Sequence, residues 1–150
     1  MEKNIISYNR IPICEIVQQL RKTSLRKWQT QWDSTTKALT TKEFFPNIKD
    51  RLKTKITLTP NFTALVTSHG KTKSYLHRFK IIESPDCPCR GGSQTVDHLL
   101  FDCTILQDER ERIIGKISRH DNCPVNKSQM GNKCIKHFIQ FTNSIDFTKL

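Results

Sequence analysis

Residues 87–103 read CPCRGGSQTVDHLLFDC and carry four zinc-type ligands: Cys87, Cys89, His98 and Cys103. Zinc prefers thiolate and imidazole ligands, and a tetrahedral set of three cysteines and one histidine is common in structural sites. The first two cysteines lie in a loop rich in proline and glycine, which lets the backbone direct both sulfurs toward one point. His98 and Cys103 are five residues apart near the start of a helix, so one turn can bring both inward. The stretch therefore predicts a structural zinc site that holds the fold together.

An alternative reading of the same stretch is a set of ordinary buried cysteines beside a surface histidine. A disulfide between Cys87 and Cys89 is disfavoured because bridging residues two apart strains the bond geometry. If all four side chains bind zinc, no position is left for water, so catalysis by the metal is not expected. The remaining cysteines, Cys14, Cys123 and Cys134, lack near partners, and Cys14 is expected to be a small side chain in the core.

The composition agrees with a thin core that a metal would help to stabilise. The chain has 150 residues, enough for one domain, and only 35% of them are hydrophobic, against about 45–50% in typical globular proteins. Spacings of three and four between apolar residues predict a mostly helical fold, a small helical domain with a zinc-knuckle-like loop and loose termini. The expected segments are an N-terminal amphipathic helix (1–34), a helical segment (35–83), the zinc-knuckle-like segment with the following helix (84–119), and a C-terminal tail with a short helix (120–150), loose over 121–133.

The N-terminal helix carries its apolar residues every three or four positions from Ile13 to Trp32. This spacing predicts one buried stripe. Trp28 and Trp32 lie on the stripe, so we expect them to pack in the core rather than to stack on bases. The opposite face mixes Glu15 and several glutamines with basic residues, which argues against an anionic membrane as partner.

The net charge of +11 comes from 25 basic and 14 acidic residues, and most of the surplus lies before residue 91. Such a surplus favours a polyanionic partner, and nucleic acid is the commonest one. Helical spacing would align basic side chains just ahead of the zinc loop, although a merely solvated helix face explains the same pattern. The candidate nucleic-acid-binding residues are Lys73, His77, Arg78, Lys80 and Arg90.

A resemblance to a known family rests on motifs that are specific in combination. They are WQTQW (Trp28–Trp32), FFP (Phe44–Pro46), SHG (Ser68–Gly70), YLHRF (Tyr75–Phe79) and CPC with TVDHLLFDC (Cys87–Cys103). Together they resemble the C-terminal segment, after the ribonuclease H domain, of Jockey-like non-LTR retrotransposon reverse transcriptase polyproteins. The resemblance covers nearly the whole chain and implies a CCHC zinc-knuckle-like tail that helps to hold template RNA or target DNA. One departure is Arg90, because in that family a glycine often follows the second cysteine.

The resemblance implies a non-catalytic fragment whose partners are RNA or single-stranded DNA, with no small-molecule substrate. Two-metal phosphoryl chemistry needs several converging carboxylates, whereas the acidic residues here are isolated or lie in the solvated run Asp108–Glu111. Alternatives are a protein-interaction platform that packs on reverse transcriptase or ribonuclease H domains, and a non-functional degenerate copy. With no signal peptide or transmembrane segment in the sequence, a nuclear and cytoplasmic location is expected.

Overall fold

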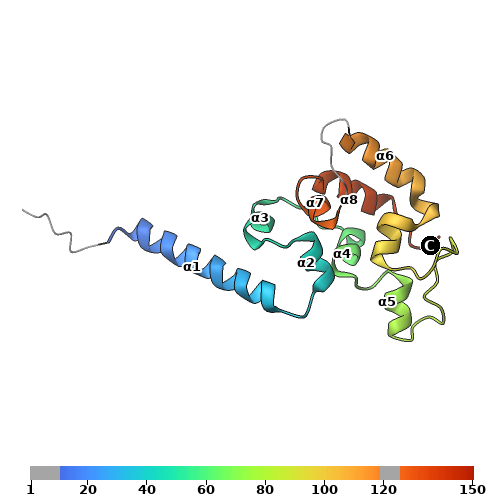
Figure 1. Ribbon diagram of the computed structural model, residues 1–150, viewed down its shortest axis with the longest axis horizontal. Helices are drawn as coiled ribbons and strands as arrows, with labels where there is room; N and C mark the ends of the chain where they lie inside the picture. The colour runs from blue at the N-terminus through green and yellow to red at the C-terminus, as the bar shows by residue number, and fades with distance from the viewer. Residues whose placement is uncertain (1–10, 119–125) are drawn as a thin grey trace, which may run out of the picture. The chain divides into compact units, whose positions relative to one another are not determined.

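The computed structural model describes residues 11–118 and 126–150. Helices dominate these residues, among which the only β-type pairing is an isolated antiparallel bridge between Asp86 and Ser93, so the prediction of a mostly helical fold is confirmed. The chain divides into two compact units, Met1–Thr35 and Thr36–Leu150, which are described separately. The described helices are α1 (Ile13–Ser34), α2 (Leu39–Phe44), α3 (Ile48–Lys53), α4 (Pro60–Thr67), α5 (Lys73–Arg78), the π-helix η1 (His98–Asp102), the 3-10 helix η2 (Thr104–Leu106), α6 (Gln107–Ser118), α7 (Lys127–Gly131) and α8 (Ile135–Ser144) (Figure 1).

Helix α1 of the first unit is long and has no buried residue. It begins after Pro12, whose carbonyl accepts a hydrogen bond from the Glu15 amide at 3.0 Å. Trp28 is 47% exposed and Cys14 is also exposed. The expected core positions of Trp28 and Cys14 are therefore wrong, because helical spacing shows which face is apolar but not whether anything covers it.

None of the described helices has the length and apolarity needed to cross a membrane.

The core of the second unit forms where α2, α4, α7 and α8 pack together. The Phe44 and Phe138 rings stack with centroids 5.2 Å apart, and Phe62 meets Phe138 edge-on at 5.6 Å. All three side chains are at most 3% exposed. Burying one large apolar side chain stabilises a fold by about 1.5–3 kcal/mol, so this aromatic cluster is a main source of the unit's stability.

Polar contacts join α4 to α8 across most of the sequence. Thr59 caps α4 by accepting from the Phe62 amide, and Pro60 occupies the first turn, where its missing N–H costs little. The Asn61 side-chain amide then donates to the carbonyls of Thr142 at 3.0 Å and Ile145 at 2.9 Å. The start of α4 is thereby fixed against the end of α8.

Helix α7 lies in a stretch that the sequence predicted to be loose. Asn126 and Gln129 form a reciprocal capping box at its start, which explains why so short a helix persists. Lys127 forms ion pairs with Glu43 of α2 and with Asp97, which precedes η1. The Lys127 side chain is only 12% exposed, and the two carboxylates raise the pKa of its ammonium group against the opposing effect of burial. Residues 121–125 lie outside the described residues.

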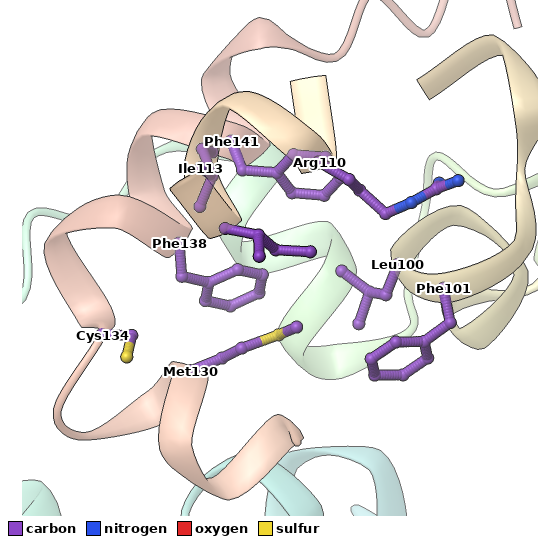
Figure 2. A pocket seen from close by; sticks show the side chains of 9 residues that line it. Leu100, Phe101, Arg110, Ile113, Met130, Cys134, Phe138 and Phe141 are labelled. Carbon is purple, nitrogen blue, oxygen red and sulfur yellow. The ribbon is translucent and has the colours of Figure 1, made fainter. Parts of the chain in front are cut away.

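An apolar cavity of about 130 Å³ separates η1, α6, α7 and α8 (Figure 2). Leu100, Ile113, Met130 and Phe138 are among the side chains that line it. Arg110 lies at its edge, and its guanidinium points away from the apolar side chains. The cavity therefore leaves unfilled apolar space between these helices, next to Phe138 of the aromatic cluster.

Candidate metal centre

The first two cysteines of the cluster lie in a tight turn closed by backbone hydrogen bonds. The Cys87 amide donates to the Gly92 carbonyl, and the Arg90 amide donates to the Cys87 carbonyl, both at 2.9 Å. Arg90 and Gly92 adopt positive φ angles of 61° and 121°. Arg90 thus adopts the left-handed conformation at the position where the resembled family often has glycine. A side chain makes this backbone conformation less favourable by about 1–2 kcal/mol.

The other two cluster residues are brought together by a π-turn. The Cys103 amide donates to the His98 carbonyl at 2.7 Å, a bond spanning five residues. In an α-helix, residues five apart would point about 140° away from each other, whereas the wider π-turn returns both to nearly the same side. The Thr95 hydroxyl accepts from the His98 amide at 3.1 Å and caps this turn. A π-turn rather than an α-helix therefore aims His98 and Cys103 at the loop.

The four predicted ligand atoms converge within 4.8 Å of one another. The Cys87 and Cys103 sulfurs are 3.7 Å apart, and the Cys89 sulfur lies 3.1 Å from His98 Nε2. For zinc–sulfur bonds of about 2.3 Å, the sulfur–sulfur edge of a tetrahedron is about 3.8 Å. The separation of these two sulfurs therefore fits the edge of a zinc tetrahedron, and the cluster could hold a metal ion.

The backbone of Gly91 lies close to Cys89 and His98. The Gly91 amide donates to the Cys89 sulfur at 3.3 Å. A Cβ atom at residue 91 would lie 3.2 Å from His98 Cε1 and 3.3 Å from the Cys89 sulfur, tighter than most such contacts. Glycine at this position lets the loop approach the imidazole and direct an amide at the thiolate.

The protonation states of two cysteines differ in the metal-free cluster. Burial raises the pKa of the Cys87 thiol to about 11. Burial alone would also raise the pKa of Cys89, but the Gly91 amide and the other three cluster side chains outweigh it and lower that pKa to about 6. Cys89 is therefore a thiolate at neutral pH and ready to bind a cation. Cys87 must lose its proton when a metal arrives.

The sequence-predicted basic residues lie on or near α5 and the loop. His77, Arg78, Lys80 and Arg90 are exposed, whereas Lys73 is half-buried. The positive φ of 57° at Lys80 turns the chain directly after α5. The role of these five residues in binding nucleic acid stays a prediction.

Gln94 was not singled out by the sequence, yet it connects the loop to α5. Its side-chain oxygen accepts from the Lys73 amide at 2.9 Å, and its side-chain nitrogen donates to the Leu150 carbonyl at 3.0 Å. The residue is 1% exposed. A lone glutamine in a polar loop gives no sequence signal for such a role, because its two partners lie 21 and 56 residues away. His120 and Cys123 lie outside the described residues, and Cys134 is buried away from the cluster.

Comparison with known proteins shows what the chain is similar to. It is 35% identical over 101 residues, 65% of its length, to the "Retrovirus-related Pol polyprotein from type-1 retrotransposable element R1" of Popillia japonica. The chain is related to retrotransposon polyproteins. The protein of the same name from Bradysia coprophila is 29% identical over 85 residues, 56% of this chain. The matches cover 39% and 8% of those two relatives, so this chain corresponds to only part of such a polyprotein. No family model and no solved structure matches it.

Proposed function

We propose that this chain is a zinc-stabilised, nucleic-acid-binding C-terminal tail of a non-LTR retrotransposon reverse transcriptase polyprotein, without a catalytic centre of its own. The observation that carries the proposal is the convergence of three sulfurs and one imidazole nitrogen within 4.8 Å, beside a basic helix. The similarity to R1 polyproteins supports the retrotransposon origin. The narrower resemblance to Jockey-like elements, and the position after a ribonuclease H domain, remain predictions.

Zinc in this cluster would be structural. Four protein ligands fill a tetrahedron and leave no open position for water or substrate. Cys87, His98 and Cys103 are each at most 6% exposed, and Leu99 and Leu100 between the last two ligands are core residues. A bound ion would therefore pin the loop onto η1 and, through η1, onto the core of the second unit.

Nucleic-acid binding is proposed from charge and position. The chain has a net charge of +11. Exposed basic side chains occur on both α5 and the loop, and Gln94 ties these two segments together through the Lys73 amide. Lysine and arginine bind phosphates and release condensed counterions, which makes the affinity salt-dependent. RNA or single-stranded DNA is the proposed partner, and the nucleus and cytoplasm are the proposed location.

The test measures binding of the zinc-loaded chain to a labelled single-stranded RNA by fluorescence anisotropy across a salt series. If about five phosphates are neutralised, log affinity should fall with log salt with a slope of about −3 to −4. The double variant Arg78→Gln/Lys80→Gln should bind more weakly with a shallower slope. Its control, Lys49→Gln/Lys53→Gln on α3, removes the same charge elsewhere and should change binding little. An affinity independent of salt, or equal losses in both double variants, would contradict the proposal.

A second candidate function is a protein-interaction platform, favoured by the exposed apolar residues of α1. Ile13 is 80% and Leu20 62% exposed. The partners would be reverse transcriptase or ribonuclease H domains of the parent polyprotein. RNA binding by the joined polyprotein but not by the lone chain would favour this candidate. A chain that binds neither RNA nor the neighbouring domains would be a degenerate copy.

A further inference from the structure

Three aromatic rings form a continuous ladder along one edge of α5. We name His69, Tyr75 and Phe79 the aromatic ladder. The ring centroids of His69 and Tyr75 are 5.2 Å apart, and those of Tyr75 and Phe79 are 4.8 Å apart. The Arg78 guanidinium lies over both Tyr75 and Phe79, 5.3 Å and 5.0 Å from their centroids. The three rings are thus in contact at tilts of 52° and 45°, with one cation over two of them.

Phe79 ends the ladder in solvent. It is 55% exposed, while Tyr75 behind it is half-buried and supports it. The backbone holds Phe79 in place: its amide donates to the Leu76 carbonyl at 3.2 Å, and the Ile81 amide donates to the same carbonyl at 3.0 Å. A backbone fixed in this way loses little conformational freedom when the ring it carries binds a flat partner.

The charges around Phe79 indicate what that flat partner is. Arg78 precedes it, Lys80 follows it, and His77 lies two residues before it, all exposed. Isolated exposed apolar side chains are common and need no partner. An exposed aromatic ring flanked by cations, however, matches a ligand that combines a phosphate backbone with planar bases.

We propose that Phe79 stacks on a base of single-stranded nucleic acid, with Arg78 and Lys80 on the adjacent phosphates. This proposal rests on the proposed nucleic-acid binding and specifies the contact by which a single strand would be recognised. A base in a duplex is already stacked on both faces and paired at its edge, so the ring cannot reach its π-face without unstacking it. The ladder should therefore make the chain prefer single strands, with little sequence preference, since every base has a π-face.

The test uses the full zinc-loaded chain, a labelled single-stranded oligoribonucleotide and the duplex of the same strand. Phe79→Ala should weaken single-strand binding about 5- to 150-fold, the equivalent of about 1–3 kcal/mol per stacked base. Duplex binding should stay the same, and the salt dependence should not change because no charge is lost. Phe79→Trp should restore single-strand binding. Ile81→Ala is the matched control. It shortens a neighbouring apolar side chain that is 64% exposed but has no π-face.

The outcomes distinguish a failure of the stacking proposal from a failure of the proposed nucleic-acid binding. If the wild-type chain binds no nucleic acid, the proposed function fails and the stacking fails with it. If binding is salt-dependent but indifferent to Phe79→Ala, or if Ile81→Ala or duplex binding shows an equal loss, only the stacking is overturned. Circular dichroism and zinc content that match the wild type ensure that a loss of binding is not a loss of folding.

Discussion

A Cβ atom added to Gly131 would lie 2.1 Å from the carbonyl oxygen of Phe44. Helix α7 thus meets the end of α2 backbone to backbone, at the point where the Phe44 ring enters the aromatic cluster. Only a residue without a side chain permits this approach, since the neighbouring atom is backbone and cannot rotate away.

Gly131→Ala should therefore destabilise the second unit by about 3 kcal/mol through overpacking. Gly115→Ala is the matched control, because nothing lies within 4 Å of its added Cβ. Alanine favours a helix over glycine by about 1 kcal/mol, so the control should be neutral or slightly stabilising. Urea unfolding of both variants measures the difference, and equal midpoints would show that α7 does not pack on α2.

Removal of one cluster ligand should release the metal. Cys103→Ser and His98→Ala should lower the zinc content from one ion per chain to none and unfold the region around η1. Structural zinc contributes on the order of 10 kcal/mol in small zinc domains, so partial loss is not expected. Mass spectrometry under native conditions measures the content. The control is Cys14→Ser, which replaces an exposed cysteine of α1 and should leave the zinc content of the chain unchanged. If Cys103→Ser also leaves the zinc content unchanged, the site is refuted.

The two cysteines with shifted pKa values should react at different rates in the metal-free chain. At pH 7 Cys89, with a pKa of about 6, is mostly thiolate, while Cys87, with a pKa of about 11, is thiol and is buried. Because the thiolate is the nucleophile, iodoacetamide should alkylate Cys89 first. Lowering the pH through 6 should slow the alkylation of Cys89, because its thiolate gains a proton. Peptide mass spectrometry follows each site, and zinc should protect both; faster alkylation of Cys87 would contradict the assignment.

Replacing Gln94 should loosen the loop from α5. Gln94→Leu removes the acceptor of the Lys73 amide and the donor to the Leu150 carbonyl. Each buried polar group left without a partner costs about 1–3 kcal/mol, so the variant should lose about 2–6 kcal/mol of unfolding free energy. Gln140→Leu, on the exposed side of α8, is the control for added hydrophobicity and should unfold like the wild type. Thermal denaturation compares the two.

Arg90→Gly should separate backbone strain from charge. Glycine accepts the φ of 61° without a steric cost, so the zinc-loaded variant should be about 0.5–1 kcal/mol more stable, or at worst equal once its greater freedom in the unfolded chain is included. The same change removes one cation, so RNA binding should weaken and the salt slope should become shallower by about 0.7. Arg90→Gln, which loses the charge but keeps a side chain, should weaken binding without the gain in stability.

Local interactions explain why much of the fold and the cluster could be predicted from the sequence. Thr59 and Pro60 start α4, and Thr95 caps the turn that holds His98, because capping acts within three residues of a helix end. The four candidate ligands lie within 17 consecutive residues, Cys87–Cys103, so their chemistry and spacing were visible without knowledge of any distant contact.

Features that depend on distant contacts could not be predicted in this way. The π-turn between His98 and Cys103 departs from the α-helical spacing that the sequence favoured. Helix α7 forms where the sequence predicted a loose segment. Gln94 acquires its role from backbone groups far along the chain. Periodicity also misplaced Trp28, since a stripe of apolar residues is buried only where another element covers it. The ligand set and the helical character thus follow from near neighbours in the chain, whereas which groups meet, and which faces stay in water, depends on segments that come together only on folding.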